Sequence, residues 1–172
     1  CVIAYLCLRP KDSVQTEYLT VSGGVFGTTY KITLQADSDY HGSIMRTLQE
    51  VDNSLSTFNK TSVITKINNN EPVTLDEHFI KVFNLAMLVS EDTDGAFDIT
   101  VAPLVNAWGF GFKTKQMPTE EQVDSLKQYV GYRAVSLNGS KVKKQNPHIM
   151  LDCSAIAKGY GVDAVADMLK AK

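Results

Sequence analysis

Cysteine and histidine are scarce in this chain, and neither forms a cluster. The three cysteines, Cys1, Cys7 and Cys153, are an odd number at wide spacing, which fits neither a disulfide framework nor a zinc-binding pattern. The three histidines stand apart from one another and from the cysteines, so we expect them at the surface or at helix ends. A disulfide-stapled scaffold and a zinc enzyme are therefore both disfavoured.

An excess of one charge sign is also absent. The 17 Lys and Arg residues nearly balance the 19 Asp and Glu residues, and the formal net charge is −2. A nucleic-acid-binding surface needs a basic excess concentrated on one face or along one segment. We therefore expect no nucleic-acid partner for this chain.

Long apolar runs are missing too. Residues 1–8 read CVIAYLCL and are apolar, but they are too short to span a bilayer. This start is either the remnant of an export signal or membrane anchor, or a short N-terminal strand. The residues Ala-Tyr-Leu before Cys7 match a lipoprotein cleavage site poorly. We assign residues 1–17 to an N-terminal segment and expect the folded domain over residues 18–172.

The common signatures of nucleophilic catalysis, metal binding and nucleotide binding are absent as well. The sequence contains no G-x-S-x-G, no H-E-x-x-H, no calcium loop, and no glycine-rich fingerprint of the G-x-G-x-x-G or G-x-x-x-x-G-K-[ST] type. Cys153 follows an apolar stretch, so we expect a buried, structural thiol and not a reactive one.

Apolar periodicity predicts both strands and helices. Period-two alternation predicts a strand over residues 28–36, which forms a hairpin with the strand-like residues 16–24. A second hairpin is predicted over residues 134–137 with 140–144, with a type I′ turn at Asn138-Gly139. The apolar run in residues 148–153 predicts a buried strand. Spacings of three and four residues predict helices over residues 41–58, 79–90 and 119–130, and from Ser154 onward. The expected N-caps are Thr74, Thr119 and Ser154. Strands and helices in mixed order favour an α+β fold, with a mixed or antiparallel sheet and flanking helices.

One turn of the last predicted helix contains three unfavourable residues. Lys158 lies near the helix N-terminus, where a cation opposes the helix dipole, and Gly159 and Gly161 each cost about 1 kcal/mol relative to alanine. A phosphate bound at the free N–H groups of this helix would turn the lysine into a favourable partner. A solvated lysine with two glycines for packing is the alternative.

Two other stretches have unusual composition. In DGAFDITVAPLVNAWGFG, residues 94–111, Asp98 lies in an apolar run that Pro103 breaks, and glycines beside Trp108 and Phe110 would expose flat rings. Phe58 and Asn59 lie where the amphipathic pattern of residues 41–58 stops. Taken alone, the first stretch is most simply core and the second is most simply a helix end followed by a polar loop.

Taken in order, four of these stretches resemble the ApbE family of FAD:protein FMN transferases. The stretches are GGVFGTTYKI, LSTFNKTSVITKIN, GAFDITVAPLVNAWGFG and LDCSAIAKGYGVDAVADML, and the resemblance runs from about residue 18 to the end. It implies an ApbE-like, T-fold-like domain that binds FAD and Mg²⁺. It also implies transfer of the FMN moiety to a threonine or serine of an acceptor flavoprotein.

The resemblance also implies roles for individual residues of this chain. Phe26 would lie near the flavin, in a position that is often methionine, and Phe58 would stack on FAD in a position that is often tyrosine. Ala96, Phe97 and Asp98 would contact FAD, and Lys158 would contact it near the pyrophosphate. Ala155 would offer its backbone carbonyl to Mg²⁺. The resemblance does not identify a catalytic residue.

The resemblance further implies a longer parent protein. Family members run to about twice this length, and their second half supplies an aspartate and a threonine to Mg²⁺, so we expect residues 18–172 to be the N-terminal part of such a domain. Hydrolysis of FAD to FMN and AMP, and flavin binding without catalysis, are the alternatives. Membership also implies an exported protein, periplasmic or anchored on the outer side of a bacterial membrane.

Overall fold

The structure is a computed structural model that describes residues 18–36, 38–110 and 117–172. The chain divides into two compact units, Cys1–Gly42 and Ser43–Lys172, and each is described by itself. The N-terminal segment predicted over residues 1–17 lies outside the described residues. No helix of the described ranges has the length and apolarity needed to cross a membrane.

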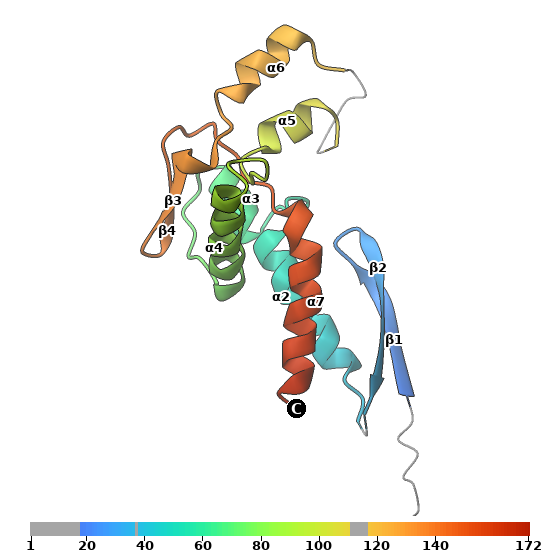
Figure 1. Ribbon diagram of the computed structural model, residues 1–172. Coiled ribbons are helices and arrows are strands. Elements are labelled where there is room, and N and C mark those ends of the chain that lie inside the picture. The colour runs from blue at the N-terminus through green and yellow to red at the C-terminus, as the bar shows by residue number, and fades with distance from the viewer. Residues whose placement is uncertain (1–17, 37, 111–116) are drawn as a thin grey trace, which may run out of the picture. The chain divides into compact units, whose positions relative to one another are not determined.

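The first unit contains an antiparallel hairpin of strands β1 (Tyr18–Val25) and β2 (Thr28–Gln35), which confirms the predicted pair (Figure 1). The prediction centred the turn on three glycines, whereas the two loop residues are Phe26 and Gly27. Both have positive φ, 54° and 68°, the combination that a type I′ turn requires. Phe26 therefore occupies a left-handed position that non-glycine residues seldom adopt.

The second unit is mainly helical (Figure 1). Its helices in the described ranges are α2 (His41–Leu55, which begins in the first unit), α3 (Val63–Asn68), α4 (Glu77–Asp92), α5 (Ala102–Ala107), α6 (Glu120–Lys127) and α7 (Ser154–Lys170). The 3₁₀ turn η1 (Tyr132–Ala134) precedes the second hairpin. Two of these helices, α3 and α5, were not predicted, because six residues are too few for a helical period to stand out.

The core of the second unit comes from the apolar faces of α2, α3 and α4. Its fully or nearly fully buried side chains include Ile44, Val51, Leu55, Ile64, Phe79, Val82, Phe83 and Ala86. Along the chain, α4 packs against α7, and α5 against α6. The spacing of three and four residues that predicted α2 and α4 therefore reports the faces that are buried.

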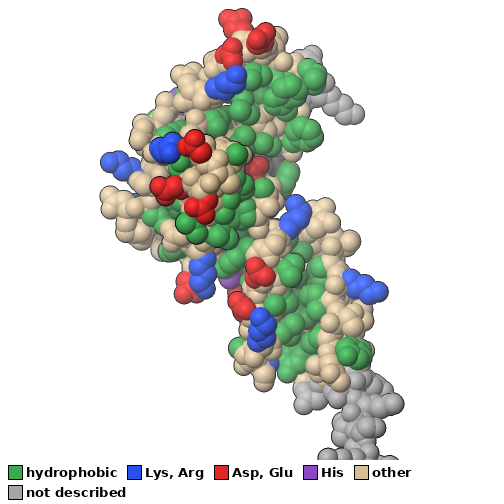
Figure 2. Space-filling model, in the orientation of Figure 1, with side chains coloured by type: hydrophobic (Ala, Val, Ile, Leu, Met, Phe, Trp, Pro, Cys, Tyr) green, Lys and Arg blue, Asp and Glu red, His purple; other side chains and the backbone are tan. Residues whose placement is uncertain are grey.

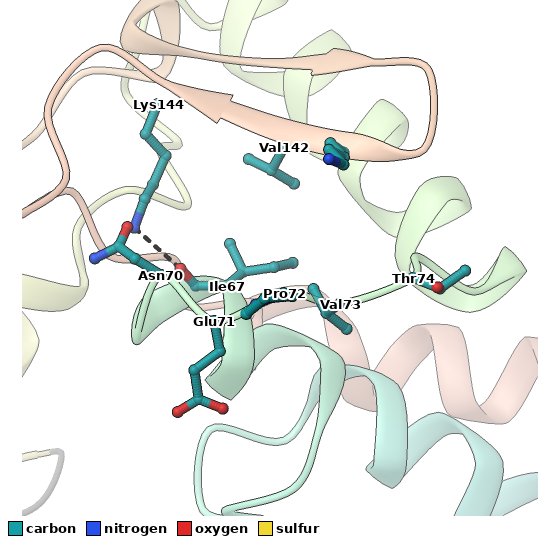
Figure 3. Close-up of a pocket in the computed structure, with 9 residues that line it drawn as sticks. Ile67, Asn70, Glu71, Pro72, Val73, Thr74, Val142 and Lys144 are labelled. Atoms are coloured by element: carbon teal, nitrogen blue, oxygen red, sulfur yellow. Dashed lines mark hydrogen bonds between the residues drawn. The ribbon is translucent and has the colours of Figure 1, made fainter.

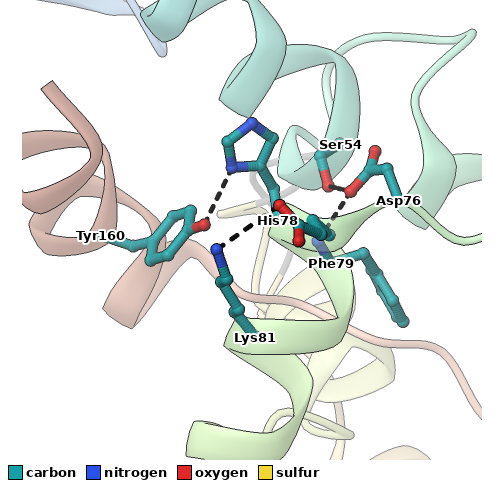
Figure 4. A network of polar contacts seen from close by, with 7 residues as sticks. Ser54, Asp76, His78, Phe79, Lys81 and Tyr160 are labelled. Carbon is teal, nitrogen blue, oxygen red and sulfur yellow. Dashed lines mark hydrogen bonds and ion pairs between the residues drawn. The ribbon is translucent and has the colours of Figure 1, made fainter. Parts of the chain in front are cut away.

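Polar contacts tie α2, α4 and α7 together (Figure 4). Asp76 is the N-cap of α4, and its Oδ1 accepts hydrogen bonds from Phe79 N at 2.8 Å and from the buried hydroxyl of Ser54 at 2.7 Å. His78 Nδ1 lies 2.8 Å from the Tyr160 hydroxyl, which joins α4 to α7. His78 thus has a structural partner at a helix end.

Antiparallel strands β3 (Val135–Asn138) and β4 (Lys141–Lys144) form the second hairpin, as predicted. Its turn was predicted wrongly. Because Asn138 pairs with Lys141, the loop residues are Gly139 and Ser140, and only Gly139 has positive φ, at 58°. This combination fits a type II′ turn. Helices with two small antiparallel sheets make the described chain α+β, as predicted, although its strands form two separate hairpins instead of one larger sheet.

Three further local predictions were wrong. Thr74 does not cap α4, because the side chain two residues later, Asp76, takes that position. Ser154 does not cap α7 but is its first residue, and its N–H donates to Asp152 Oδ1 at 2.7 Å. The predicted strand 148–153 is an extended segment whose ladder is reduced to a single parallel bridge between Met150 and Val101.

Candidate functional site

Three segments that are distant in sequence meet around one cavity of about 400 Å³. The segments are the turn after α2 with α3, the α5 region, and the extended segment that leads into α7. The lining residues are Thr57, Phe58, Lys60, Thr65, Asn68, Asn69, Ala102, Val105, Asn106, Phe110, Met150, Leu151, Asp152 and Ser154. The volume falls within the range of about 300–1,000 Å³ that is usual for small-molecule sites.

Phe58 forms the first wall of the cavity. It follows the end of α2, and 63% of its surface is exposed, which is unusual for a phenylalanine. The turn that carries it is fixed by Asn59, whose amide nitrogen donates to Asp52 Oδ2 at 3.2 Å and to Asn53 Oδ1 at 3.0 Å. An exposed aromatic ring that lines a cavity can stack on a flat ligand.

The second wall is α5 and the residues after it. Pro103 does not break the chain here but lies in the first turn of α5, where a missing N–H costs nothing. After the helix, Trp108 is 44% exposed and Phe110 is 80% exposed, and Gly109 between them has φ 79°. The simplest interpretation of this stretch, as core, is therefore wrong for Trp108 and Phe110, and the neighbouring glycines were the better indication. In Figure 2, hydrophobic side chains gather around this part of the visible face.

The third wall is the segment that enters α7. Asp152 N donates to Ile99 O at 2.7 Å, and Asp152 Oδ1 accepts from Ser154 N, so the segment turns sharply into the helix. Ala155 and Lys158 are exposed in the first turns of α7. They do not line the cavity but belong to the same helix end as Ser154, which does. The positive end of the helix dipole therefore lies beside the cavity.

The polar groups of the cavity are mostly neutral. Side-chain amides come from Asn68, Asn69 and Asn106, and hydroxyls from Thr57, Thr65 and Ser154. Lys60 and Asp152 are the two charged residues that line it. Apolar walls with amide donors and acceptors suit a heteroaromatic ring that carries carbonyl and N–H groups.

Asp98 does not line the cavity. Its Oδ1 accepts from Thr100 N and from Thr100 Oγ1, both at 2.7 Å, and its Oδ2 accepts from Tyr132 N at 2.8 Å. The Thr100 hydroxyl in turn accepts from Gly131 N at 2.7 Å. The carboxylate therefore has the hydrogen-bond partners that its place in an apolar run requires.

The other residues singled out from the sequence lie in different places. Ala96 is exposed and Phe97 half-buried, in the turn between α4 and Asp98. Phe26 belongs to the first unit, so its position relative to the cavity is not described. Of the sequence-derived candidates, Phe58 is the one that the structure places in the cavity lining.

Among the described residues, no group of three or more His, Cys, Asp or Glu side chains could hold a metal ion. Ala155, to whose carbonyl the resemblance assigns Mg²⁺, lies in the first turn of α7, close after Asp152 and Ser154 in sequence. Asp152 Oδ1 is already bonded to Ser154 N at 2.7 Å. Mg²⁺ requires six oxygen ligands in near-octahedral geometry. The described residues therefore fit at most part of such a site.

Cys153 lies at the start of α7 and is 1% exposed. Burial raises the pKa of its thiol to about 12, and the Asp152 carboxylate contributes in the same direction. A nucleophilic cysteine needs a lowered pKa and some exposure. The prediction of a structural, unreactive thiol is confirmed.

Sequence reasoning missed most of the residues that line the cavity. Asn68, Asn69 and Asn106 were not singled out, because asparagines are common in turns and loops, and Asn68 and Asn69 belong to a run of three that is typical of a loop. Phe110 carried a recognisable signal, since it lies between Gly109 and Gly111. Asp152 was noted only as the end of a predicted strand.

Comparison with known proteins gives one consistent result. The model of the ApbE family matches residues 26–172. The chain is 33% identical over 183 aligned residues to the FAD:protein FMN transferase of Vibrio cholerae, covering 96% of this chain and 52% of the relative. It is 34% identical to the Haemophilus influenzae protein of the same name, covering 91% and 50%.

Solved structures agree with the sequence comparison. The flavin transferase ApbE of Vibrio cholerae superposes with a TM-score of 0.85 at 34% identity, over 90% of this chain and 54% of that one. The apo form of the Pseudomonas stutzeri flavinyl transferase ApbE gives 0.84 at 30% identity, over 93% and 55%. The chain spans about half the length of the curated relatives it matches.

Proposed function

The chain belongs to the ApbE family, and from this premise we propose that the full-length protein is a FAD:protein FMN transferase. One structural observation supports the proposal most directly. Three of the four sequence stretches that carry the family resemblance meet around a single cavity, although up to about 90 residues separate them along the chain. That cavity combines an exposed aromatic side chain, neutral amides and a helix N-terminus.

We propose that a ring of FAD lies in this cavity, against Phe58 and the α5 region. Phe58 supplies an aromatic face, and stacking on it is worth roughly 1 kcal/mol beyond the area buried. Phenylalanine has no hydroxyl, so this position would contribute stacking alone. Ala96, Phe97 and Asp98 would contact FAD, as the resemblance implies, and the same resemblance implies a flavin contact for Phe26.

The start of α7 would bind the pyrophosphate of FAD. Helix N-termini and lysine side chains both favour phosphate oxygens, and Lys158 lies on the exposed first turns. In the reaction, the hydroxyl oxygen of an acceptor threonine or serine bonds to the phosphorus of the FMN half. The bond from that phosphorus to the bridging oxygen breaks, AMP leaves, and the hydroxyl proton is released. Positioning and charge neutralisation supply most of the catalysis in such transfers.

Magnesium belongs to the proposal for the whole protein. When bound, it would neutralise phosphate charge, and Ala155 would contribute its backbone carbonyl. Because the described residues fit only part of a six-coordinate site, no step is assigned to the metal.

The test is an activity assay of the full-length protein. Incubation with FAD, Mg²⁺ and a flavoprotein carrying an acceptor threonine should give covalently bound flavin, visible as in-gel fluorescence and as an FMN-sized mass increase. Lys158→Ala should lower the rate at least tenfold, because one charge-assisted contact is worth about 1.5–3 kcal/mol. The matched control is Lys170→Ala, at the opposite end of α7.

Two results would count against the assignment. Flavin transfer at the wild-type rate in the Lys158→Ala variant would show that Lys158 does not contribute to the pyrophosphate site. Release of FMN and AMP without labelled acceptor would make the protein a FAD hydrolase, with water in place of the acceptor hydroxyl.

We also propose that the protein is exported and works on the outer side of a bacterial membrane. The apolar start CVIAYLCL and the family resemblance support this location. Fractionation of cells that express the full-length gene would test it, and recovery of the protein in the cytosol would contradict it.

A further inference from the structure

The segment from Pro147 to Asp152 carries one wall of the cavity but has little regular structure to hold it. Its backbone ladder consists of one parallel bridge, from Met150 to Val101, and the bond from Asp152 N to Ile99 O. Its last residues line the cavity and lead directly into α7. The position of the α7 N-terminus therefore depends on what else fixes this segment.

Asn68, the last residue of α3, bonds both backbone polar groups of one residue in this segment, Leu151. Its Nδ2 donates to Leu151 O at 2.9 Å, and its Oδ1 accepts from Leu151 N at 2.7 Å. The side-chain amide thus does what a neighbouring strand would do, since it satisfies a buried N–H and C=O together. Leu151 is completely buried, so water cannot replace these bonds.

Lys144, on β4, fixes the same segment from the other side. Its Nζ donates to Ile149 O at 3.0 Å and Pro147 O at 3.2 Å, and also to Ile67 O at 3.0 Å. Figure 3 shows the side chain running from the hairpin down to the end of α3. Burial lowers the pKa of Lys144, and three carbonyl acceptors offset the cost of burying its charge. One ammonium group therefore joins β4, α3 and the segment.

We propose that Lys144 and Asn68 are positioning residues for FAD. They fix the position of the α7 N-terminus relative to the wall of the cavity that binds the ring. This inference rests on the proposed function, since FAD is the ligand that would span both walls. Lys144 does not line the cavity, so it acts through the segment and not by contact. Asn68 reaches the same segment from within the cavity lining.

A further hydrogen bond links the two walls through α3. Ser62, the N-cap of α3, donates its buried hydroxyl to Ser56 O at 2.7 Å, in the turn that precedes Phe58. The short helix α3 therefore holds the Phe58 wall at one end and the α7 wall at the other, through Asn68. A displacement of about 1 Å between such walls is enough to cost up to about a hundredfold in a reaction that depends on positioning.

The test compares two ligands on the full-length protein. FAD has the ring and the pyrophosphate, whereas riboflavin has the ring alone, and flavin fluorescence quenching gives both dissociation constants. Lys144→Met should weaken FAD binding by about tenfold or more and change riboflavin binding by less than about twofold. The neighbouring Lys143 is exposed on the same strand, so Lys143→Met is the matched control and should change neither. Asn68→Ala should follow Lys144→Met for FAD.

Amide hydrogen exchange tests, without any ligand, whether Lys144 fixes the segment from Pro147 to Asp152; we call the contacts of Lys144 and Asn68 with this segment the clamp. Lys144→Met should speed exchange over residues 149–158 and leave α4 protected, while Lys143→Met should behave as wild type. Unchanged FAD affinity in Lys144→Met would overturn the inference, as would an equal loss of FAD and riboflavin affinity. If the wild-type protein bound no FAD, the proposed function would fail, and unchanged exchange over 149–158 would separately overturn the clamp.

Discussion

Removing the Asp98 carboxylate should destabilise the protein strongly, because three donors lose their acceptor at once. Asp98 accepts from Thr100 N, Thr100 Oγ1 and Tyr132 N, at 2.7, 2.7 and 2.8 Å. Thr100 is completely buried, so water cannot reach its N–H or hydroxyl in an Asp98→Ala variant. Each unsatisfied buried donor costs about 1–3 kcal/mol. Because the Tyr132 N–H can partly relax toward other acceptors, the free energy of unfolding should fall by about 3–5 kcal/mol. This is a large part of a typical stability of about 5–15 kcal/mol.

Two further variants separate the parts of this cost. Asp98→Asn keeps an oxygen for Thr100 but turns an amide N–H₂ toward Tyr132 N, so it should lose about 1–3 kcal/mol. Thr100→Val removes the hydroxyl that donates to Asp98 and accepts from Gly131 N. Because the two residues share a bond, the double variant should lose less stability than the sum of the single variants.

Urea unfolding followed by far-UV circular dichroism measures these values, and an unchanged m-value would show that each variant keeps the same folded state. A loss below about 1 kcal/mol for Asp98→Ala would refute the reasoning. If such a stable variant still lost FAD affinity, Asp98 would act by contact with FAD alone, as the family resemblance implies.

Two other sites give simpler predictions. Asp76→Ala removes the N-cap of α4 and the partner of the buried Ser54 hydroxyl. Urea unfolding should therefore show a free energy of unfolding that is lower by about 2–3 kcal/mol. A decrease of less than about 0.5 kcal/mol would mean that the cap is dispensable. In a variant with Cys1 and Cys7 changed to serine, native Cys153 should react with iodoacetamide at pH 8 about a thousandfold more slowly than the unfolded chain. A pKa of about 12 instead of 9.0 leaves that much less thiolate, and reaction at the unfolded rate would contradict its burial.

Local chemistry predicted the elements whose determinants are adjacent in sequence. The capping box of Thr119 and Gln122 is present in the structure, because both reciprocal bonds lie within four residues of chain. The helix it starts was predicted to run to Val130 but ends at Lys127, and α2 ends at Leu55 instead of residue 58. Helix ends depend on what the next residues contact, which a sequence period does not contain.

The wrong predictions share a cause, which is competition from partners distant in sequence. Thr74 and Asp76 are both acceptable N-caps, and Asp76 takes the position where its carboxylate also meets Ser54, 22 residues earlier. Residues 148–153 contain an apolar run that resembles a buried strand, but Asn68 and Lys144 satisfy part of their backbone in place of a neighbouring strand. No pattern within residues 148–153 contains that information.

In the candidate site, too, a residue whose partners are distant in sequence could not be predicted from the sequence. The family resemblance and the structure therefore identify different residues of the site. The family resemblance alone assigned a role to Phe58, since its stretch taken by itself is most simply a helix end, and Phe58 lines the cavity. Asn68 was invisible, since its role exists only where Leu151 is brought to it. Both Asp98 and Asn68 hold nearby backbone through side-chain hydrogen bonds to its N–H or C=O groups. A site fixed by so few side chains should lose its geometry before the surrounding helices unfold. Lys144→Met should therefore lower FAD affinity without the global loss of stability expected from a variant at a buried core residue such as Phe79.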